Sequence, residues 1–318
     1  MYRIYNNLKI FTISMIYALF LTLYFPIDDS IIDRGNYLIY AENSLIIVGR
    51  YLDESIFALF FNEPVWLMIN IVLSSFLEPQ NTLRTIIFVS SFTVSFLLLR
   101  NNLRYFWILL IILAFPNVIK NFIIHIRQGL AIAFFLIGWF SSSKSTKYFF
   151  FILSPFVHAS FFLVIALYFL TSMLQKMKFA FDLRLIIYLI IGVVISFGLG
   201  FIASLLGMRQ ANEYEFTAAS SSGLGFLFWL AILLTYMSNG KEYLRKNSFI
   251  FGMIIFYLAT YFFVEVTARI FESVIVIVLL ASLELKLKQK YIVFCIIVCF
   301  TILSYVLRLD QNYLGFGI

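Results

Sequence analysis

Apolar runs separated by short polar segments follow one another along the chain. Those long enough to cross a membrane, or nearly so, are 10–25, 64–77, 85–99, 105–119, 128–140, 148–170, 185–206, 224–238, 248–264, 270–285 and 291–307. A spanning helix needs about 20 residues, so the shorter runs favour tilted or partly inserted helices. We predict an all-α, polytopic integral membrane protein with about 11 hydrophobic helical segments, forming a single transmembrane helical domain over residues 1–318.

The composition supports this class and excludes others. Hydrophobic residues make up 63% of the 318 residues, charged residues make up 12%, and the mean hydropathy is +0.98. A soluble domain carries about 25% charged residues, so a soluble enzyme, a disordered chain and a nucleic-acid-binding domain are excluded. The pI of about 9.3 reflects basic loops that orient the chain in a membrane, and no nucleic-acid partner is expected.

Charge predicts the orientation of the chain. Basic clusters mark cytoplasmic loops and lie at 100–104, 144–147, 176–184, 241–246 and 286–290. The segment 26–63 holds seven acids and two arginines, which predicts an outer loop, and 116–127 and 207–223 are further outer loops. The segments 26–63 and 207–223 are candidate substrate-facing segments. Because Arg3 and Lys9 precede an uncleaved first helix, we expect a multi-pass protein of the cytoplasmic membrane with its N-terminus inside.

The run 148–170 lies between two basic loops and contains Pro155 and then His158. It is either two short half-helices that meet at the outer face, which we prefer, or one span that places 116–127 inside. Broken helices are tolerated where they line a cavity.

Several polar residues stand at the ends of, or within, the apolar runs. Arg127 and Gln128 open an apolar helix, where a charge either serves a site or reaches back to the interface. His158 lies in the middle of an apolar run. It is either a hydrogen-bonded structural residue or a base near neutral pH. Glu63 precedes Pro64. The pair is either an ordinary helix start signal, or Glu63 is a carboxylate that binds sugar or accepts a proton.

Further candidates lie outside these helix starts. Asp33, Arg34 and Tyr37 supply the carboxylate, cation and aromatic face of a sugar site. Arg269 lies at helical spacing between Glu265 and Glu272. The three residues form either a self-neutralised row of ion pairs or a site in which two acids hold a buried arginine aimed at phosphate. Arginine also dominates the predicted outer side, Arg209 included, and guanidinium groups bind phosphate bidentately. Export bias and lipid headgroup contact are the alternative explanation.

Motifs for other chemistries are missing from the sequence. There is no P-loop, no HExxH and no His/Cys metal cluster, so we expect neither a metal nor a cofactor. Cys295 and Cys299 are too few for a disulfide framework and are interpreted as packing residues.

The stretches IRQGLAIAFFLIGW (126–139) and SPFVHASFFLVIALYFL (154–170) resemble the bacterial EpsG/Wzy polysaccharide polymerases. Those proteins show an IRQ-x-LA helix followed by an fH-x-S helix, which matches Arg127, Gln128, His158 and Ser160. Asp33 with Tyr37, Glu63 and Arg269 match shorter features of the family.

The resemblance implies a metal-independent glycosyltransferase, a Wzy-type polymerase of O-antigen, capsule or exopolysaccharide. It would move a growing glycan from undecaprenyl diphosphate to a new lipid-linked oligosaccharide at the outer face of the bacterial inner membrane. A flippase and a chain-length regulator would be its partners, and membrane lipid would surround it.

The roles expected from this comparison are specific. Arg127 and Arg269 would stabilise the leaving diphosphate, and His158, with Glu63 as second choice, would act as the base. Asp33, Arg34, Tyr37, Gln128, Ser160 and Arg209 would bind substrate. Three alternatives remain. One is a transporter or flippase of lipid-linked sugars, which usually shows a repeat of halves that we do not find. The others are a membrane acyltransferase, which needs an acid close to His158, and a purely structural subunit.

Overall fold

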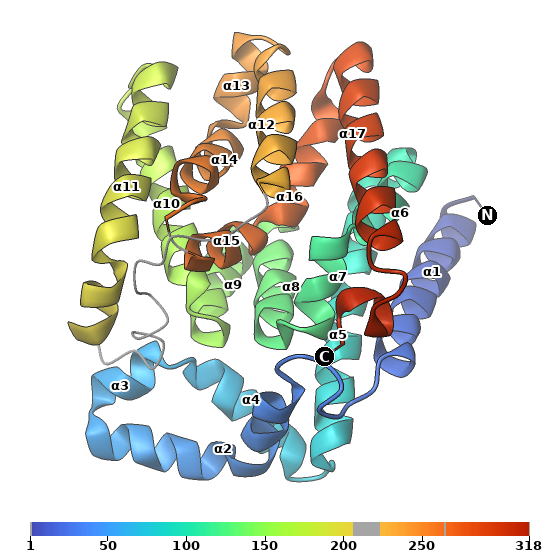
Figure 1. The fold of residues 1–318 in the computed structure, drawn as a ribbon, viewed down its shortest axis with the longest axis vertical. Coiled ribbons are helices and arrows are strands. Elements are labelled where there is room, and N and C mark those ends of the chain that lie inside the picture. The colour runs from blue at the N-terminus through green and yellow to red at the C-terminus, as the bar shows by residue number, and fades with distance from the viewer. Residues whose placement is uncertain (1, 206–222, 264, 318) are drawn as a thin grey trace. The chain divides into compact units, whose positions relative to one another are not determined.

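The computed structural model describes residues 2–205, 223–263 and 265–317 (Figure 1). Over these ranges the chain is helical, and one isolated β-bridge joins Ile31 to Gly317. The chain divides into two compact units, one formed by residues 1–161 with 303–318 and the other by residues 162–302. The single domain expected from the sequence stays a prediction.

The first unit contains helices α1 to α9. Their bounds are α1 (Tyr2–Tyr24), α2 (Arg34–Glu54), α3 (Ile56–Phe61), α4 (Pro64–Ser74), α5 (Pro79–Asn102), α6 (Phe106–Leu113), α7 (Pro116–Ile123), α8 (Ile126–Phe140) and α9 (Lys144–Val157). Helix α5 packs against α1 on one side and α8 on another, and α8 packs against α9. Helix α2 runs across the direction of α1 and α5 (Figure 1) and packs on α4.

Proline starts three helices of this unit, because its fixed φ suits the first helical position and its missing N–H is not needed there. These prolines are Pro64, Pro79 and Pro116. The break before Pro116 frees backbone carbonyls at the end of α6. Tyr17 donates to the carbonyl of Leu113 and Tyr305 to that of Ala114, each at 2.9 Å, which satisfies these groups where water is scarce.

The second unit contains most of α10 (Ser160–Lys176) and the helices that follow, except for the last residues of α17 (Leu287–Val306), which belong to the first unit. The helices between α10 and α17 are α11 (Phe181–Leu205), α12 (Leu224–Met237), α13 (Lys241–Lys246), α14 (Ser248–Thr260), α15 (Glu265–Glu272) and α16 (Ile275–Leu280). Helix α11 packs closely on α14, because Gly252 leaves room for the ring of Tyr188. The Tyr188 hydroxyl bonds to Thr171, so this contact also ties in α10.

Helical structure coincides with every apolar run within the described residues, as predicted. Among the described residues, four helices are long and apolar enough to cross a membrane, within Tyr5–Tyr24, Pro79–Leu113, Phe181–Gly198 and Leu287–Val306, or five if the bent pair α7–α8 is one span. Helices α4, α10, α12 and α14 and the stretch Ile275–Glu284 are shorter and apolar. The all-α, polytopic membrane class is therefore confirmed.

Two segments expected to be loops are helical. Helices α2 and α3 occupy most of 26–63, and α7 occupies most of 116–127. The run 148–170 is broken, as preferred, and His158 separates α9 from α10. Cys295 and Cys299 are exposed on α17 and do not pack inside the protein. The predicted outer loop 207–223 lies, except for its last residue, outside the described residues.

Candidate active site

A carboxylate at the start of α4 is the centre of the candidate site. Glu63 has the left-handed backbone conformation (φ 60°, ψ 54°), which is uncommon for a residue other than glycine and costs about 1–3 kcal/mol. This conformation turns the chain from α3 into α4, and Pro64 then starts the helix. The Glu63 side chain is buried, so its charge needs partners.

Both oxygens of Glu63 have such partners, from two distant parts of the sequence. Oε2 accepts a hydrogen bond from Nη1 of Arg127 in a buried ion pair. Oε1 lies 2.8 Å from Nδ1 of His158 and accepts a hydrogen bond from the backbone N–H of Ala159 at 3.2 Å. A single carboxylate therefore joins the starts of α4, α8 and α10.

A sharp bend in the backbone positions Arg127. Helices α7 and α8 meet at 110° across a short break, and Arg127 is the second residue of α8. Gly129 permits this bend, because a Cβ atom there would lie 2.3 Å from the backbone oxygen of Asn121 in α7. The glycine of the IRQG stretch thus has a structural role next to the arginine.

The break between α9 and α10 positions His158. Its backbone is extended (φ −150°, ψ 122°), and α10 begins two residues later at Ser160. Ending α9 here leaves the Ala159 N–H without an intrahelical partner, and the Glu63 carboxylate accepts it. An acid at the start of a helix also interacts favourably with the helix dipole.

Aromatic side chains of α2 and α4 form one side of the site. The Arg127 guanidinium carbon lies 5.6 Å from the ring centre of Tyr37 and 5.4 Å from that of Tyr40. Both rings pack edge-on against the fully buried Trp66, with ring centres 5.8 and 6.4 Å apart. Such cation–π contacts are worth about 2 kcal/mol when desolvated.

The partners of Glu63 decide its protonation state. Burial by itself would raise the pKa of Glu63, but Arg127 and the hydrogen bonds from His158 and Ala159 hold the pKa below its ordinary value. Glu63 is therefore ionised at neutral pH. A carboxylate held in this way is a weak base, which favours a positioning role over the second-choice base expected from the sequence.

The other predicted site residues lie elsewhere in the chain and differ in how far they are buried. Asp33 is the exposed N-cap of α2, Gln128 is buried in α8, and Ser160 is half-buried. Arg34 is fully buried, and its guanidinium nitrogens have no hydrogen-bond acceptor among the described residues. Arg269, with Glu272 nearby in α15, belongs to the second unit, and Arg209 lies outside the described residues.

The structure thus brings Glu63, Arg127, His158 and Tyr37 together. Sequence reasoning missed Tyr40 and Trp66. The signal was present, since the buried residues Tyr37, Tyr40, Ala41, Ser44 and Tyr51 recur at helical spacing along α2. Among the described residues, no group of three His, Cys, Asp or Glu side chains is arranged to hold a metal ion.

The helices and this site define a polytopic membrane protein with a largely buried cluster of Glu63, Arg127 and His158. The model of the EpsG family matches residues 15–316, and the chain belongs to this family. This membership supports a polysaccharide polymerase-type role in a membrane. No curated protein and no solved structure matches the chain.

Proposed function

We propose that the chain is a polysaccharide repeat-unit polymerase, a glycosyltransferase that lengthens a glycan carried on undecaprenyl diphosphate. The observation that carries the proposal is the Glu63 carboxylate, which holds an arginine and a histidine together in a membrane protein of the EpsG family. In the reaction, the bond from the donor sugar C1 to the lipid diphosphate breaks. A bond from the acceptor hydroxyl oxygen to that C1 forms.

His158 is the base of the proposed reaction. A neutral imidazole that donates its Nδ1–H to Glu63 carries its lone pair on Nε2, which accepts the acceptor hydroxyl proton. The same logic orients histidine in acid–histidine–nucleophile triads. About 12% of the His158 side chain is exposed, which leaves access from outside the cluster.

Arg127 stabilises the leaving diphosphate. One nitrogen pairs with Glu63, and about 14% of the side chain remains exposed to receive a phosphate oxygen. A fixed cation at the developing charge lowers the barrier because it needs no reorganisation. Arg269 supplies a second cation, and Asp33, Tyr37, Gln128 and Ser160 bind sugar in this scheme. Arg209 is a further proposed substrate contact, and Arg34, which is fully buried, would act on the substrate through its charge rather than by contact.

The proposed setting is the outer face of the bacterial inner membrane, with the N-terminus in the cytoplasm. A flippase delivers the lipid-linked units, and a chain-length regulator sets the product size. The reaction as written needs no metal, because arginine neutralises the phosphates.

One observation also favours a membrane acyltransferase. Such an enzyme needs an acid beside its histidine, and Glu63 stands 2.8 Å from His158. The paired Arg127 and the family membership favour the polymerase, since an acyl transfer leaves no diphosphate to neutralise.

Surface glycolipids from a strain lacking this chain, separated on a gel, test the proposal. A polymer ladder that collapses to a single-repeat band, and returns with the native protein, is the expected result. Loss of the single-repeat band as well would point to export, and an intact ladder lacking only an acyl group would point to the acyltransferase.

A further inference from the structure

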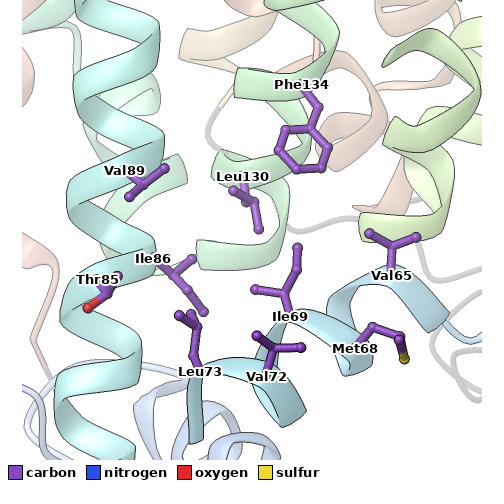
Figure 2. Close-up of a pocket in the computed structure, with 10 residues that line it drawn as sticks. All are labelled: Val65, Met68, Ile69, Val72, Leu73, Thr85, Ile86, Val89, Leu130 and Phe134. Atoms are coloured by element: carbon purple, nitrogen blue, oxygen red, sulfur yellow. The ribbon is translucent and has the colours of Figure 1, made fainter. Parts of the chain in front are cut away.

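An apolar groove lies beside the charged cluster, within the first unit. Helices α4, α5 and α8 enclose a space of about 400 Å³ (Figure 2). Its walls include Val65, Ile69 and Val72 of α4, Ile86 and Val89 of α5, and Leu130 of α8. Thr85 is the one polar residue of the lining, and its hydroxyl bonds to the backbone oxygen of Asn81 in its own helix. The groove therefore offers no polar group to a ligand.

The Glu63–Arg127 ion pair stands at the starts of two of the helices that line the groove, α4 and α8. Val65 is two residues beyond Glu63, and Leu130 is one helical turn beyond Arg127. In Figure 2 Ile69 of α4 and Leu130 of α8 point towards each other. A ligand that lies along α4 in this groove would thus have one end at the charged cluster.

The groove is also open on one side. Met68, Val72 and Val89 are 58%, 54% and 46% exposed, although each is apolar. In a membrane protein such side chains contact hydrocarbon, so a lipid chain can enter sideways. The volume falls within the range of ligand pockets, about 300–1,000 Å³.

We infer that this groove holds the part of the lipid carrier's hydrocarbon chain that adjoins its diphosphate, with the diphosphate at Arg127. The inference rests on the proposed function. An anionic group joined to one apolar chain matches a cation at the end of one apolar groove, whereas a membrane phospholipid carries two chains.

The groove orients the carrier more than it adds affinity. Moving a hydrocarbon chain from the bilayer into an apolar groove gains little, because lipid tails are as apolar as the lining. The benefit is to hold the diphosphate in place, where a displacement of about 1 Å can cost a hundredfold in rate. Filling the groove should therefore reduce the turnover rate more than the apparent affinity.

Photocrosslinking tests the inference without any polymerisation. The full-length protein in phosphatidylglycerol nanodiscs carries a benzophenone amino acid in place of Val72, or in place of Ile16 of α1 as the control. Ile16 is 61% exposed and belongs to a different helix. The probe is a C55 polyprenyl diphosphate without sugar.

The expected result is a polyprenyl adduct at position 72, little at position 16, and loss of the adduct in the Arg127→Ala background. Phosphatidylglycerol adducts alone at position 72, or equal polyprenyl adducts at both positions, would overturn the inference. This outcome is separate from the gel of surface glycolipids. If the polymer ladder depends on this chain but no polyprenyl adduct forms, the groove inference is refuted and the proposed polymerase function is not.

A second pair of variants measures the effect on the reaction. Val89→Trp fills the groove, and Ile16→Trp adds the same bulk elsewhere. We expect Val89→Trp to reduce the rate of polymerisation roughly tenfold or more and Ile16→Trp to leave it unchanged. Equal rates for both variants, at equal protein abundance, would contradict the inference.

Discussion

The carboxylate of Glu63 lies 2.8 Å from Nδ1 of His158, although 95 residues separate the two in the chain. The same carboxylate pairs with Arg127 through its other oxygen. Glu63 therefore fixes the orientation of both side chains that the proposed reaction uses, and its own role is to position them.

Arg127→Lys should abolish most activity although the charge is kept. A lysine cannot both pair with Glu63 and cover the rings of Tyr37 and Tyr40 as the planar guanidinium does. We expect polymer formation to fall by roughly a hundredfold, about 3 kcal/mol. Arg50→Lys, an exposed change in α2, is the control and should be neutral. Full polymerisation by Arg127→Lys would show that a positive charge alone suffices at this position and would contradict the role given to the planar guanidinium.

Gly129→Ala should open the bend between α7 and α8. The added Cβ would lie 2.3 Å from the Asn121 carbonyl oxygen, so the helices must move apart and Arg127 must move with them. We expect a loss of about 1–3 kcal/mol of stability, and lost activity, measured by thermal unfolding and by the polymer ladder.

Gly49→Ala is the matched control for that change. Nothing lies within 4 Å of a Cβ atom at position 49, inside α2, so alanine should be neutral or slightly stabilising. A melting temperature that falls equally in both variants would show that the bend does not depend on Gly129.

Tyr37→Phe and Tyr37→Leu separate the ring from the hydroxyl. Phenylalanine keeps the aromatic face under Arg127 and the edge contact with Trp66, whereas leucine loses both. We expect the leucine variant to be less stable than the phenylalanine variant by about 1–2 kcal/mol. If both variants lost activity equally, the hydroxyl, which hydrogen-bonds to Arg127, would be the functional group and the ring would be secondary.

The acid side of the stability profile should depend on Glu63. Because its pKa is lower in the folded protein than in the unfolded chain, Glu63 stabilises the fold above its unfolded pKa. That contribution is lost as the pH falls below about 4 towards the folded pKa. Melting temperatures of the native protein and of Glu63→Gln between pH 3 and 7 check this. The two should converge at low pH, and parallel curves would contradict the assignment.

Much of the fold could be predicted from the sequence, because apolar runs report directly on buried helices. The polar helix α2 was not predicted, since its buried stripe, although at helical spacing, contains tyrosine, serine and even Arg34 rather than aliphatic residues. The individual site residues Arg127, His158 and Glu63 stood out as polar groups at the ends or breaks of apolar runs. Their pairing could not be predicted, because it depends on how α4, α8 and the α9–α10 break pack together. The bend before Arg127 was hidden in a segment expected to be a loop.

The most direct test of the central claim is the reaction itself. Purified full-length protein in nanodiscs is supplied with the lipid-linked repeat unit of its own strain, and released lipid diphosphate and new glycosidic linkages are counted together. The account predicts one diphosphate per linkage for the native protein, and neither product for His158→Ala at equal abundance. Linkage formation by His158→Ala at the native rate, or diphosphate release without linkage by the native protein, would contradict it.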